Sequence, residues 1–408
     1  MNMKTKEKLI RHDHNHDGLE RRGFLECGAW NLNAAIRKER FMQQRSIASR
    51  FVAALCLVAL ASGAAQAQYR FTRIADETGP LRFNGSPAAI NDAGEVTFAA
   101  DTITGPGVFV GRGGPVSTVA DTSDGFRFFG FSSIDGRGEV SFFAFRNDGS
   151  GGIFSGPHGE TTFIDDSGPI FGFGGDCHSS RSGAFTTIHA FLKNGGQSIF
   201  AGRNGAMTTI ADTSGDFSSF DTDPSVNAHR QVAFQGNLRS GGTGIFVSNG
   251  ETLTTVADTS GIFAEFTGAS SINNRGEVAF GAILKSEDGG FFRPDGIFVG
   301  SGGQVRTVVD SSGPFFNFLA FGHPTINDKG QVAFFGFLDN FQSGLFVGPD
   351  PVADRVILIG DPLDGSTVIG LSVFRDYLNN AGQLVLTVLL ADGRTEIIRA
   401  DPVPEPGM

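Results

Sequence analysis

The sequence is poor in cysteine, tryptophan and tyrosine, and each shortage restricts what the protein can be. It holds three cysteines, one tryptophan and two tyrosines in 408 residues. Only Cys177 lies beyond the leader described below, so the processed chain can form no internal disulfide and must draw its stability from a core. No tryptophan and only Tyr69 and Tyr377 follow residue 67, so the aromatic side chains usually exposed at carbohydrate sites are scarce.

Basic residues and local catalytic motifs are also scarce. Residues 68–408 contain 21 Lys and Arg against 37 Asp and Glu. Nucleic acids and anionic membranes bind basic faces, so neither is expected as a partner. The chain has no nucleophile elbow, phosphate loop or zinc-ligand pair. We therefore assign no catalytic residue and no cofactor, although an active site built from several loops would leave no local motif.

Apolar residues and glycine are abundant. Apolar residues make up 40% of the chain, charged residues 18%, and there are 58 glycines. This composition excludes a disordered chain and indicates a folded protein with frequent turns.

Residues 42–67 have the pattern of a secretory signal peptide. Two arginines precede the apolar run 51–60, and small residues follow it up to Ala65-Gln66-Ala67. The run is short for a membrane span, and the alternatives are a membrane anchor or a twin-arginine signal at Arg21-Arg22. We predict cleavage between Ala67 and Gln68, a secreted product without a membrane span, and residues 1–41 as a non-native or dispensable extension.

Two markers repeat seven times over residues 68–400, which defines seven units in one domain. The first is an Asn-x-x-Gly turn before an apolar strand, with the positions Asn91 and Gly94, Asp135 and Gly138, Ser180 and Gly183, Asn227 and Arg230, Asn273 and Gly276, Asn327 and Gly330, Asn379 and Gly382. The second is an aspartate after an apolar strand, 44 to 52 residues from the next one: Asp76, Asp121, Asp165, Asp212, Asp258, Asp310 and Asp361.

Each unit is predicted to form about four short strands. Unit five reads as strands over 263–272, 277–282, 296–300 and 305–309. Asn or Asp at the first turn position caps its own backbone, and Gly at the fourth accepts a positive φ. Seven such units match a closed all-β seven-bladed propeller. The last unit lacks its fourth strand, and residues 69–76 supply an isolated one, so the N-terminal strand should complete the last blade. An open solenoid and tandem sandwiches are the alternatives.

The seven aspartates, usually in Asp-Thr-Ser-Gly, have two interpretations. A feature present once per unit is most simply a carboxylate that caps a turn. In a closed ring the aspartates would also form a ring of carboxylates, and near the axis it would attract a cation such as calcium. These seven residues are therefore the candidates for a metal site, which we do not assign. Their sevenfold occurrence argues against the paired loops of an aspartic protease.

Three irregularities mark places where a function would differ from unit to unit. Unit three has Ser180 at the turn and the run Asp176-Cys177-His178 before it, with His189 near in sequence. Unit four has Arg230 in place of glycine, and unit five has an insertion over 284–294. Adjacent residues of an extended chain point to opposite faces, so at most two of the three residues in the run can reach one metal.

The turn sequences resemble a known group of repeats. Asn-Asp-Ala-Gly-Glu-Val-Thr-Phe (91–98), Asn-Asn-Arg-Gly-Glu-Val-Ala-Phe (273–280) and Asn-Asp-Lys-Gly-Gln-Val-Ala-Phe (327–334) are similar to the NxxGxxAF tandem repeats of exported bacterial proteins. Those proteins often end in a PEP-CTERM sorting tail, and Val403-Pro404-Glu405-Pro406 resembles its opening. Residues 401–408 stop before the apolar span and arginine cluster that sorting requires, so anchoring at the cell surface is in doubt.

Two functions follow from these observations. The first is an exported, non-enzymatic protein of the cell surface or extracellular matrix, with a binding or purely structural role and polysaccharide or a surface protein as partner. The second is a secreted glycan-acting enzyme, a hydrolase or lyase, with loop carboxylates near the axis as acid and base. Its candidate residues are Asp176, Asp221 and Asp223, together with the unit-five insertion.

Overall fold

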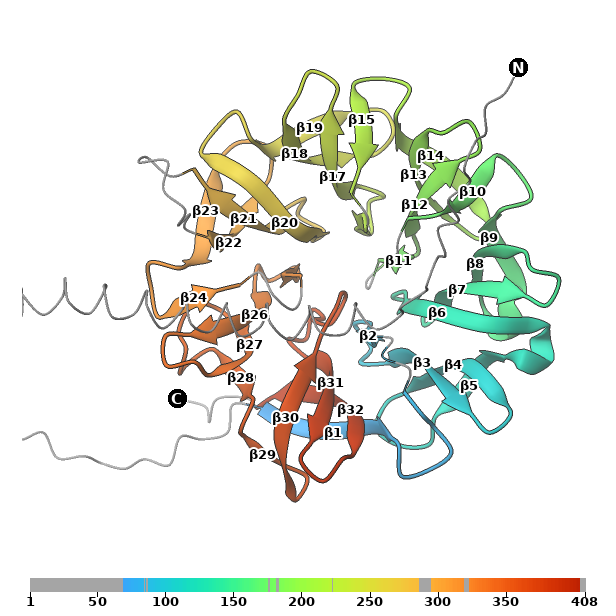
Figure 1. Ribbon diagram of the computed structural model, residues 1–408, viewed down its shortest axis with the longest axis vertical. Helices are drawn as coiled ribbons and strands as arrows, with labels where there is room; N and C mark the ends of the chain where they lie inside the picture. The colour runs from blue at the N-terminus through green and yellow to red at the C-terminus, as the bar shows by residue number, and fades with distance from the viewer. Residues whose placement is uncertain are drawn as a thin grey trace, which may run out of the picture. The chain divides into compact units, whose positions relative to one another are not determined.

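The computed structural model describes residues 69–403 except 84, 86, 175–176, 181–182, 222, 286–294 and 319–322. Within these residues seven antiparallel sheets stand in a ring about a central axis, as Figure 1 shows. Apart from the short 3-10 turns η1 (Thr122–Asp124) and η2 (Pro157–Gly159), the elements are strands. The predicted seven-bladed propeller is confirmed. The extension 1–41, the signal peptide 42–67 and residues 404–408 of the tail lie outside the described residues.

The first four blades each follow one predicted unit. Blade one holds β2 (Ala89–Ile90), β3 (Val96–Thr102), β4 (Gly105–Gly111) and β5 (Ser117–Asp121). Blade two holds β6 (Phe126–Ile134), β7 (Val140–Arg146), β8 (Gly151–Ser155) and β9 (Thr161–Asp165). Blade three holds β10 (Ile170–Phe173), β11 (His178–Ser179), β12 (Thr186–Leu192), β13 (Gln197–Arg203) and β14 (Ala206–Asp212). Blade four holds β15 (Phe217–Phe220), β16 (Ser225–Val226), β17 (Val232–Leu238), β18 (Thr243–Ser248) and β19 (Leu253–Asp258).

The last three blades complete the ring. Blade five holds β20 (Phe263–Ile272), β21 (Val278–Leu284), β22 (Asp295–Gly300) and β23 (Val305–Asp310). Blade six holds β24 (Phe315–Asn317), β25 (Thr325–Ile326), β26 (Val332–Leu338), β27 (Ser343–Val347) and β28 (Arg355–Leu358). Blade seven holds β29 (Pro362–Leu363), β30 (Ser366–Ser372), β31 (Leu384–Leu390), β32 (Thr395–Pro402) and β1 (Tyr69–Asp76).

The N-terminal strand closes the ring, as predicted. β1 pairs antiparallel with β32, from Tyr69 opposite Pro402 to Asp76 opposite Glu396. Figure 1 shows this strand, in blue, at the outer edge of the red seventh blade. Its Ile74 is buried in the core shared by blades seven and one. The first and last strands of the domain therefore hold each other in place.

Phenylalanines fill the spaces between neighbouring blades. Phe263 and Phe266 of blade five pack in one cluster with Ile245 of blade four. Phe315 and Phe318 of blade six pack in the same way against blade five. Edge-to-face contacts hold each group, and the rings of Phe263 and Phe298 lie 5.1 Å apart. These Phe-x-x-Phe pairs therefore join neighbouring blades.

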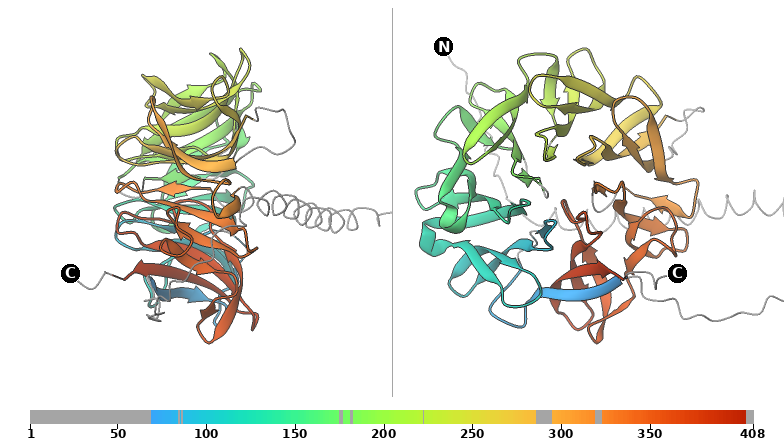
Figure 2. Two further views of the ribbon diagram at one scale, coloured as in Figure 1. Left: turned by 90° about the vertical axis from the view of Figure 1, so that its left-hand side faces the viewer. Right: turned by 180° about the vertical axis from the view of Figure 1, so that it is seen from behind.

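The ring has two different ends. At one, which we call the turn end, the Asn-x-x-Gly turns join the first and second strands of each blade. At the other, the hairpin end, hairpins join the second and third strands, and the aspartate turns lead from one blade to the next. Figure 2 shows the ring from the side and from behind. Among the described residues, no helix has the length and apolarity needed to cross a membrane.

Candidate functional site

Asparagines at the turn end link most blades to the next one. In Asn327 the side-chain oxygen accepts from the backbone N–H groups of Lys329 and Gln331, both at 3.1 Å. Its Nδ2 donates to the carbonyl of Asn379 in blade seven at 3.1 Å. Asn379 in turn donates to the carbonyl of Asn91 in blade one at 2.9 Å. The same bond leads from blade one to two, four to five and five to six.

Units two and three depart from this belt of hydrogen bonds, and unit four differs only at its glycine position. Asp135 keeps the caps to its own turn but has no amide to donate, and burial raises the pKa of its carboxyl. Blades two and three are joined instead by the N–H of Gly136, which donates to the carbonyls of Ser180 and Gly183. Arg230 adopts the left-handed conformation of the glycine it replaces, with φ of 61°.

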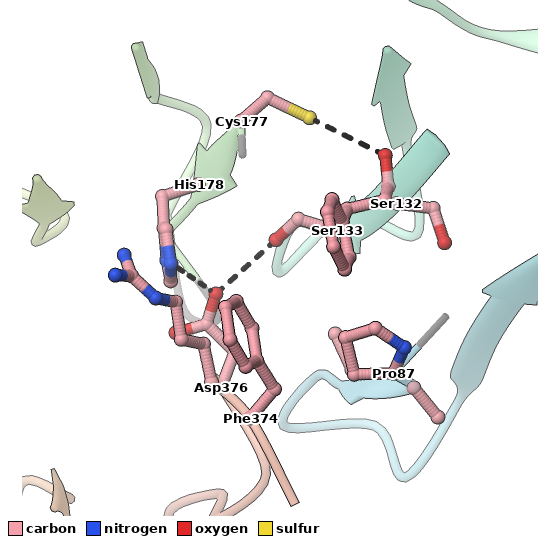
Figure 3. Close-up of a pocket in the computed structure, with 11 residues that line it drawn as sticks. Pro87, Ser132, Ser133, Cys177, His178, Phe374 and Asp376 are labelled. Atoms are coloured by element: carbon pink, nitrogen blue, oxygen red, sulfur yellow. Dashed lines mark hydrogen bonds and ion pairs between the residues drawn. The ribbon is translucent and has the colours of Figure 1, made fainter. Parts of the chain in front are cut away.

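A cluster of charged and aromatic side chains lies at the axis, on the segments that lead into the Asn-x-x-Gly turns or their equivalents. Figure 3 shows its pocket, lined by residues of blades one, two, three and seven. His178 of β11 places Nδ1 2.7 Å from Oδ2 of Asp376 in blade seven, and both side chains are at most 7% exposed. Ser133 of blade two donates to the same carboxylate oxygen at 3.2 Å. We call Phe131, Ser133, Cys177, His178, Asp223, His323 and residues 374–376 the axial cluster.

A second ion pair crosses the axis. Arg375 of blade seven pairs with Asp223 of blade four, and their side chains are 7% and 12% exposed. The guanidinium of Arg375 also lies over the ring of Phe374, 5.3 Å from its centroid, and that ring stacks on Phe131 of blade two at 5.4 Å. Each charge of the cluster thus faces an opposite or polarisable group, as buried charges require.

His323 of blade six forms the side of the cluster next to blade five. Its Nδ1 accepts the backbone N–H of Ala269 at 2.7 Å, and its ring forms a T-shaped pair with that of Phe374, with centroids 5.3 Å apart. Burial first, and His178 second, lower the pKa of His323 to about 4. At neutral pH the imidazole is therefore uncharged, which leaves Nδ1 free to accept this bond. Tyr377 fixes the backbone here, since its hydroxyl donates to the carbonyls of His323 and Ala333.

Backbone strain coincides with the two carboxylates of the cluster. Asp223 has φ of 80° and Asp376 has φ of 48°, two of the seven described non-glycine residues with positive φ. Aspartate tolerates this region better than most residues, yet the conformation still costs free energy. Residues held in such conformations gather at functional sites. The strain marks the axial cluster as the candidate functional site.

The pocket within the cluster is narrow. Its volume of about 20 Å³ admits one water-sized group. A larger ligand would place a single group there and rest on the surrounding segments.

Comparison with known proteins assigns the chain to a family. A family model matches residues 37–407, described as a family of unknown function, DUF7453. The chain belongs to this family. No curated protein matches the sequence.

Solved structures with a similar fold exist at low identity to this DUF7453 protein. Oligogalacturonate lyase from Vibrio parahaemolyticus has a TM-score of 0.48 and 11% identity over 83% of this chain and 98% of that chain. Polysaccharide lyase Uly1 has a TM-score of 0.47 and 9% identity over 79% and 91%. The β-propeller domain of the Trilobed protease from Pyrococcus furiosus has a TM-score of 0.46 and 11% identity over 77% and 93%. Likenesses at this level concern the fold, and we take no chemistry from them.

Six of the seven repeated aspartates end the outermost strand of a blade and Asp361 follows β28, so the expected ring of carboxylates lies at the rim and not at the axis (Figure 1). Six of them cap a turn. In Asp258, for example, Oδ1 accepts from the backbone N–H and the hydroxyl of Ser260 at 2.9 and 2.5 Å. Asp361 differs, because it pairs with Arg355 and accepts the N–H of Leu358. Over the described residues no three His, Cys, Asp or Glu side chains group as metal ligands. We assign no calcium site, and the screen proposed below tests for one.

The irregular units contribute only part of the axial cluster. Cys177 and His178 of unit three and Asp223 of unit four lie there, whereas Asp176 and most of the unit-five insertion lie outside the described residues. Asp221 lies two positions before Asp223 on the same segment, and its carboxylate accepts a hydrogen bond from the side-chain amide of Gln235 in β17. Burial raises the pKa of the Asp221 carboxyl. His189 is buried in blade three near Gln197, at 3.3 Å, and burial lowers the pKa of its imidazole.

Sequence reasoning missed Phe131, His323 and the run 374–376. All precede a turn asparagine, or its equivalent, by the same few positions as His178 and Asp223. The residues three and four positions before that turn residue are Pro87 and Ala88, Phe131 and Ser132, Asp223 and Pro224, Ala269 and Ser270, His323 and Pro324, and Arg375 and Asp376, with Asp176 and Cys177 in unit three. Aligning the units on their turns would have placed the charged residues at one level of the axis.

Proposed function

We propose that the protein is exported and acts outside the cell as a binding protein that takes its ligand at the axial cluster, from the hairpin end. The observation that carries this proposal is the convergence of ionisable side chains from blades three, four, six and seven on one axial site, with strained backbone at both carboxylates. Folding alone does not require these residues, because other units place Ala, Pro, Ser or Thr at the same level.

The distribution of exposed apolar side chains supports the same end of the ring. Twelve large apolar residues of the described chain are exposed, and nine of them lie at the hairpin end: Ile103, Phe128, Phe171, Ile262, Phe316, Phe341, Ile359, Ile369 and Leu389. Exposed apolar surface gathered in one region is typical of a binding face. Polysaccharide and surface protein are the two partner classes that fit an exported binding protein of this kind.

The test is a thermal-shift screen of purified residues 68–408 against calcium, a chelator, polysaccharides and candidate surface proteins. A ligand that binds only the folded state raises the unfolding midpoint. The double variant Arg375→Met/Asp223→Asn removes the axial ion pair without leaving one charge buried alone. The matched control, Arg112→Met/Glu95→Gln, removes an exposed pair of 4.0 Å at the turn end.

We expect a ligand shift in the wild type that the axial double variant loses and the control keeps. A screen without any shift, or a shift that the axial variant retains, would contradict the proposal. A calcium shift that survives in the axial variant would instead point to the rim aspartates.

One observation favours the second candidate function, a glycan-acting enzyme. A carboxylate 2.7 Å from His178 Nδ1 orients the imidazole and leaves its Nε2 to carry a proton, as in general acid–base catalysis. The test is product release from each glycan that binds, followed as new reducing ends or new unsaturated ends. His178→Gln should abolish product while binding persists. Binding without product in the wild type would leave the first function alone.

A further inference from the structure

A single turn of blade six departs from its counterparts at the hairpin end. The turn between β26 and β27 closes with the N–H of Leu338 donating to the carbonyl of Gln342, and the N–H of Phe341 donating back to Leu338. Units two, three, four and seven make the same two bonds, and in each of them glycine with positive φ stands at the position of Phe341: Gly149, Gly195, Gly241 and Gly393. Phe341 adopts φ of 68° there. A bulky side chain in this conformation is strained, so the phenylalanine is not explained by the turn.

Burial does not explain it either. The side chain of Phe341 is 56% exposed. Its ring meets that of Phe316 edge-to-face at 5.7 Å, and Phe316, itself 37% exposed, lies 6.0 Å from Phe337. We call Phe316, Phe337 and Phe341 the aromatic shelf. It combines a strained residue with an exposed apolar face at the end where the proposed ligand enters.

The turn that carries Phe341 holds two amide side chains next to it, Asn340 and Gln342. The side chain of Asn340 donates to that of Gln342 at 2.8 Å and accepts the backbone N–H of Gln342 at 3.0 Å, and both residues are exposed. No lysine or arginine occurs between Lys329 and Arg355, and Asp339 adds a negative charge to the turn. Uncharged amides beside an aromatic face suit a ligand with hydroxyls and an apolar face, and the lack of a cation disfavours a polyanion.

We infer that the aromatic shelf binds a sugar ring of a neutral polysaccharide. The apolar C–H face of the ring stacks on Phe341, and its hydroxyls exchange hydrogen bonds with Asn340 and Gln342. This inference rests on the proposed binding function and specifies its ligand class. It also locates a contact on the rim, away from the narrow axial pocket.

The test is affinity electrophoresis of purified residues 68–408 through gels that contain galactomannan, xyloglucan or soluble mixed-linkage β-glucan, with alginate and polygalacturonate as anionic comparators. Phe341→Gly restores the residue found in the sibling turns and should fold as well as the wild type, which a thermal melt verifies. Phe316→Ser removes the second exposed ring. Val352→Gly, at an exposed apolar residue of the turn end, is the control.

We expect at least one neutral polysaccharide to retard the wild type and the control. Phe341→Gly should weaken that binding tenfold or more, with Phe316→Ser weakened in the same gels. Unchanged binding by Phe341→Gly, or retardation by the anionic polymers alone, would overturn the inference. Binding of a surface protein that depends on Phe341, in a protein that binds no glycan, would also overturn it. Binding that needs the Arg375 and Asp223 pair but not Phe341 would contradict the inference about the aromatic shelf and support the proposed function. A wild type that binds nothing would contradict both.

Discussion

The turn end and the axial cluster are built from the same repeated units in opposite ways. At the turn end most units contribute the same side chain with the same bonds, as the matching partners of Asn273, Asn327 and Asn379 show. At the axial cluster each unit contributes a different residue, and those of units two, three, four, six and seven meet. The residues that repeat in most units therefore hold the ring together, while the residues that differ between units form the axial cluster. Substitutions at the turn end should change stability at any pH. Substitutions at the axial cluster should change ligand binding or the pH dependence of stability.

The largest expected effect is on the belt of the turn end. Asn327→Ala removes two caps and the amide that bonds to blade seven, and leaves these buried backbone groups without partners. We expect a loss of about 2–4 kcal/mol in the free energy of unfolding, measured by urea denaturation. Asn327→Asp, which copies the natural residue of unit two, keeps the caps and loses only the donor, so its loss should be smaller. No loss in Asn327→Asp would show that the link between blades contributes nothing, whereas equal losses in the two variants would show that the caps contribute nothing.

The cluster should make stability depend on pH through His323. Its pKa is about 4 in the folded state against an ordinary 6.5, so the unfolded chain takes up the proton first as pH falls. Stability is complete above about pH 6.5 and decreases down to about pH 4, with a loss of about 2 kcal/mol between pH 7 and pH 5. The measurement is urea denaturation at both pH values.

His323→Asn provides the control for that pH dependence. It keeps an acceptor for the N–H of Ala269 and cannot titrate, so the difference between pH 7 and pH 5 should shrink by about the same 2 kcal/mol. A pH difference that persists in this variant would assign it to other groups.

The rim aspartates should have a smaller, purely local effect. Asp258→Ala removes the acceptor of two bonds from Ser260 in an exposed turn, and should lower the free energy of unfolding by about 1 kcal/mol. The hydrogen bonds from Ser260 lower the pKa of Asp258, so its contribution is present at neutral pH and disappears as pH falls through that lowered value. Melts with calcium and with chelator should coincide in wild type and variant. A calcium-dependent midpoint that Asp258→Ala abolishes would restore the metal interpretation.

The smallest expected effect is a gain. Arg230 holds a left-handed backbone where most other units have glycine, so Arg230→Gly should raise the free energy of unfolding by about 0.5–1 kcal/mol. Urea denaturation measures it, and Gly276→Arg in the next unit should show a loss of similar size. Destabilisation by Arg230→Gly would mean that the arginine side chain contributes more than its strained backbone costs.

The fold could be predicted from the sequence because its determinants are local and repeated. The strand over 263–272 matches β20, and the strand over 69–76 matches β1, since turn residues set both ends of each segment. The candidate site was predictable only in part. Cys177 lies in an irregular run and Asp223 was a candidate acidic residue, but Arg375 and His323 are ordinary residues of otherwise regular units. Arg375 is about 150 positions from its partner Asp223, and His323 is 54 positions from Ala269. Their meeting depends on ring closure, which no local pattern encodes. The rim position of the aspartates was missed because a sevenfold repeat predicts a ring without giving its radius.

Closure of the ring by β1 also constrains the order of folding. Tyr69 pairs with Pro402, so the first strand of the domain to leave the ribosome finds its partner only after the last strand has been made. Until then Ile74 has no core to pack into. Blades one to six can form earlier, from contacts within and between neighbouring units. Pairing at such a distance in sequence is slow, because loop-closure entropy must be overcome before the contact is gained. We therefore expect the joining of blade seven to be a late and slow step of folding, and the unpaired edge of β32 to be where an unfinished chain is open to association with another copy.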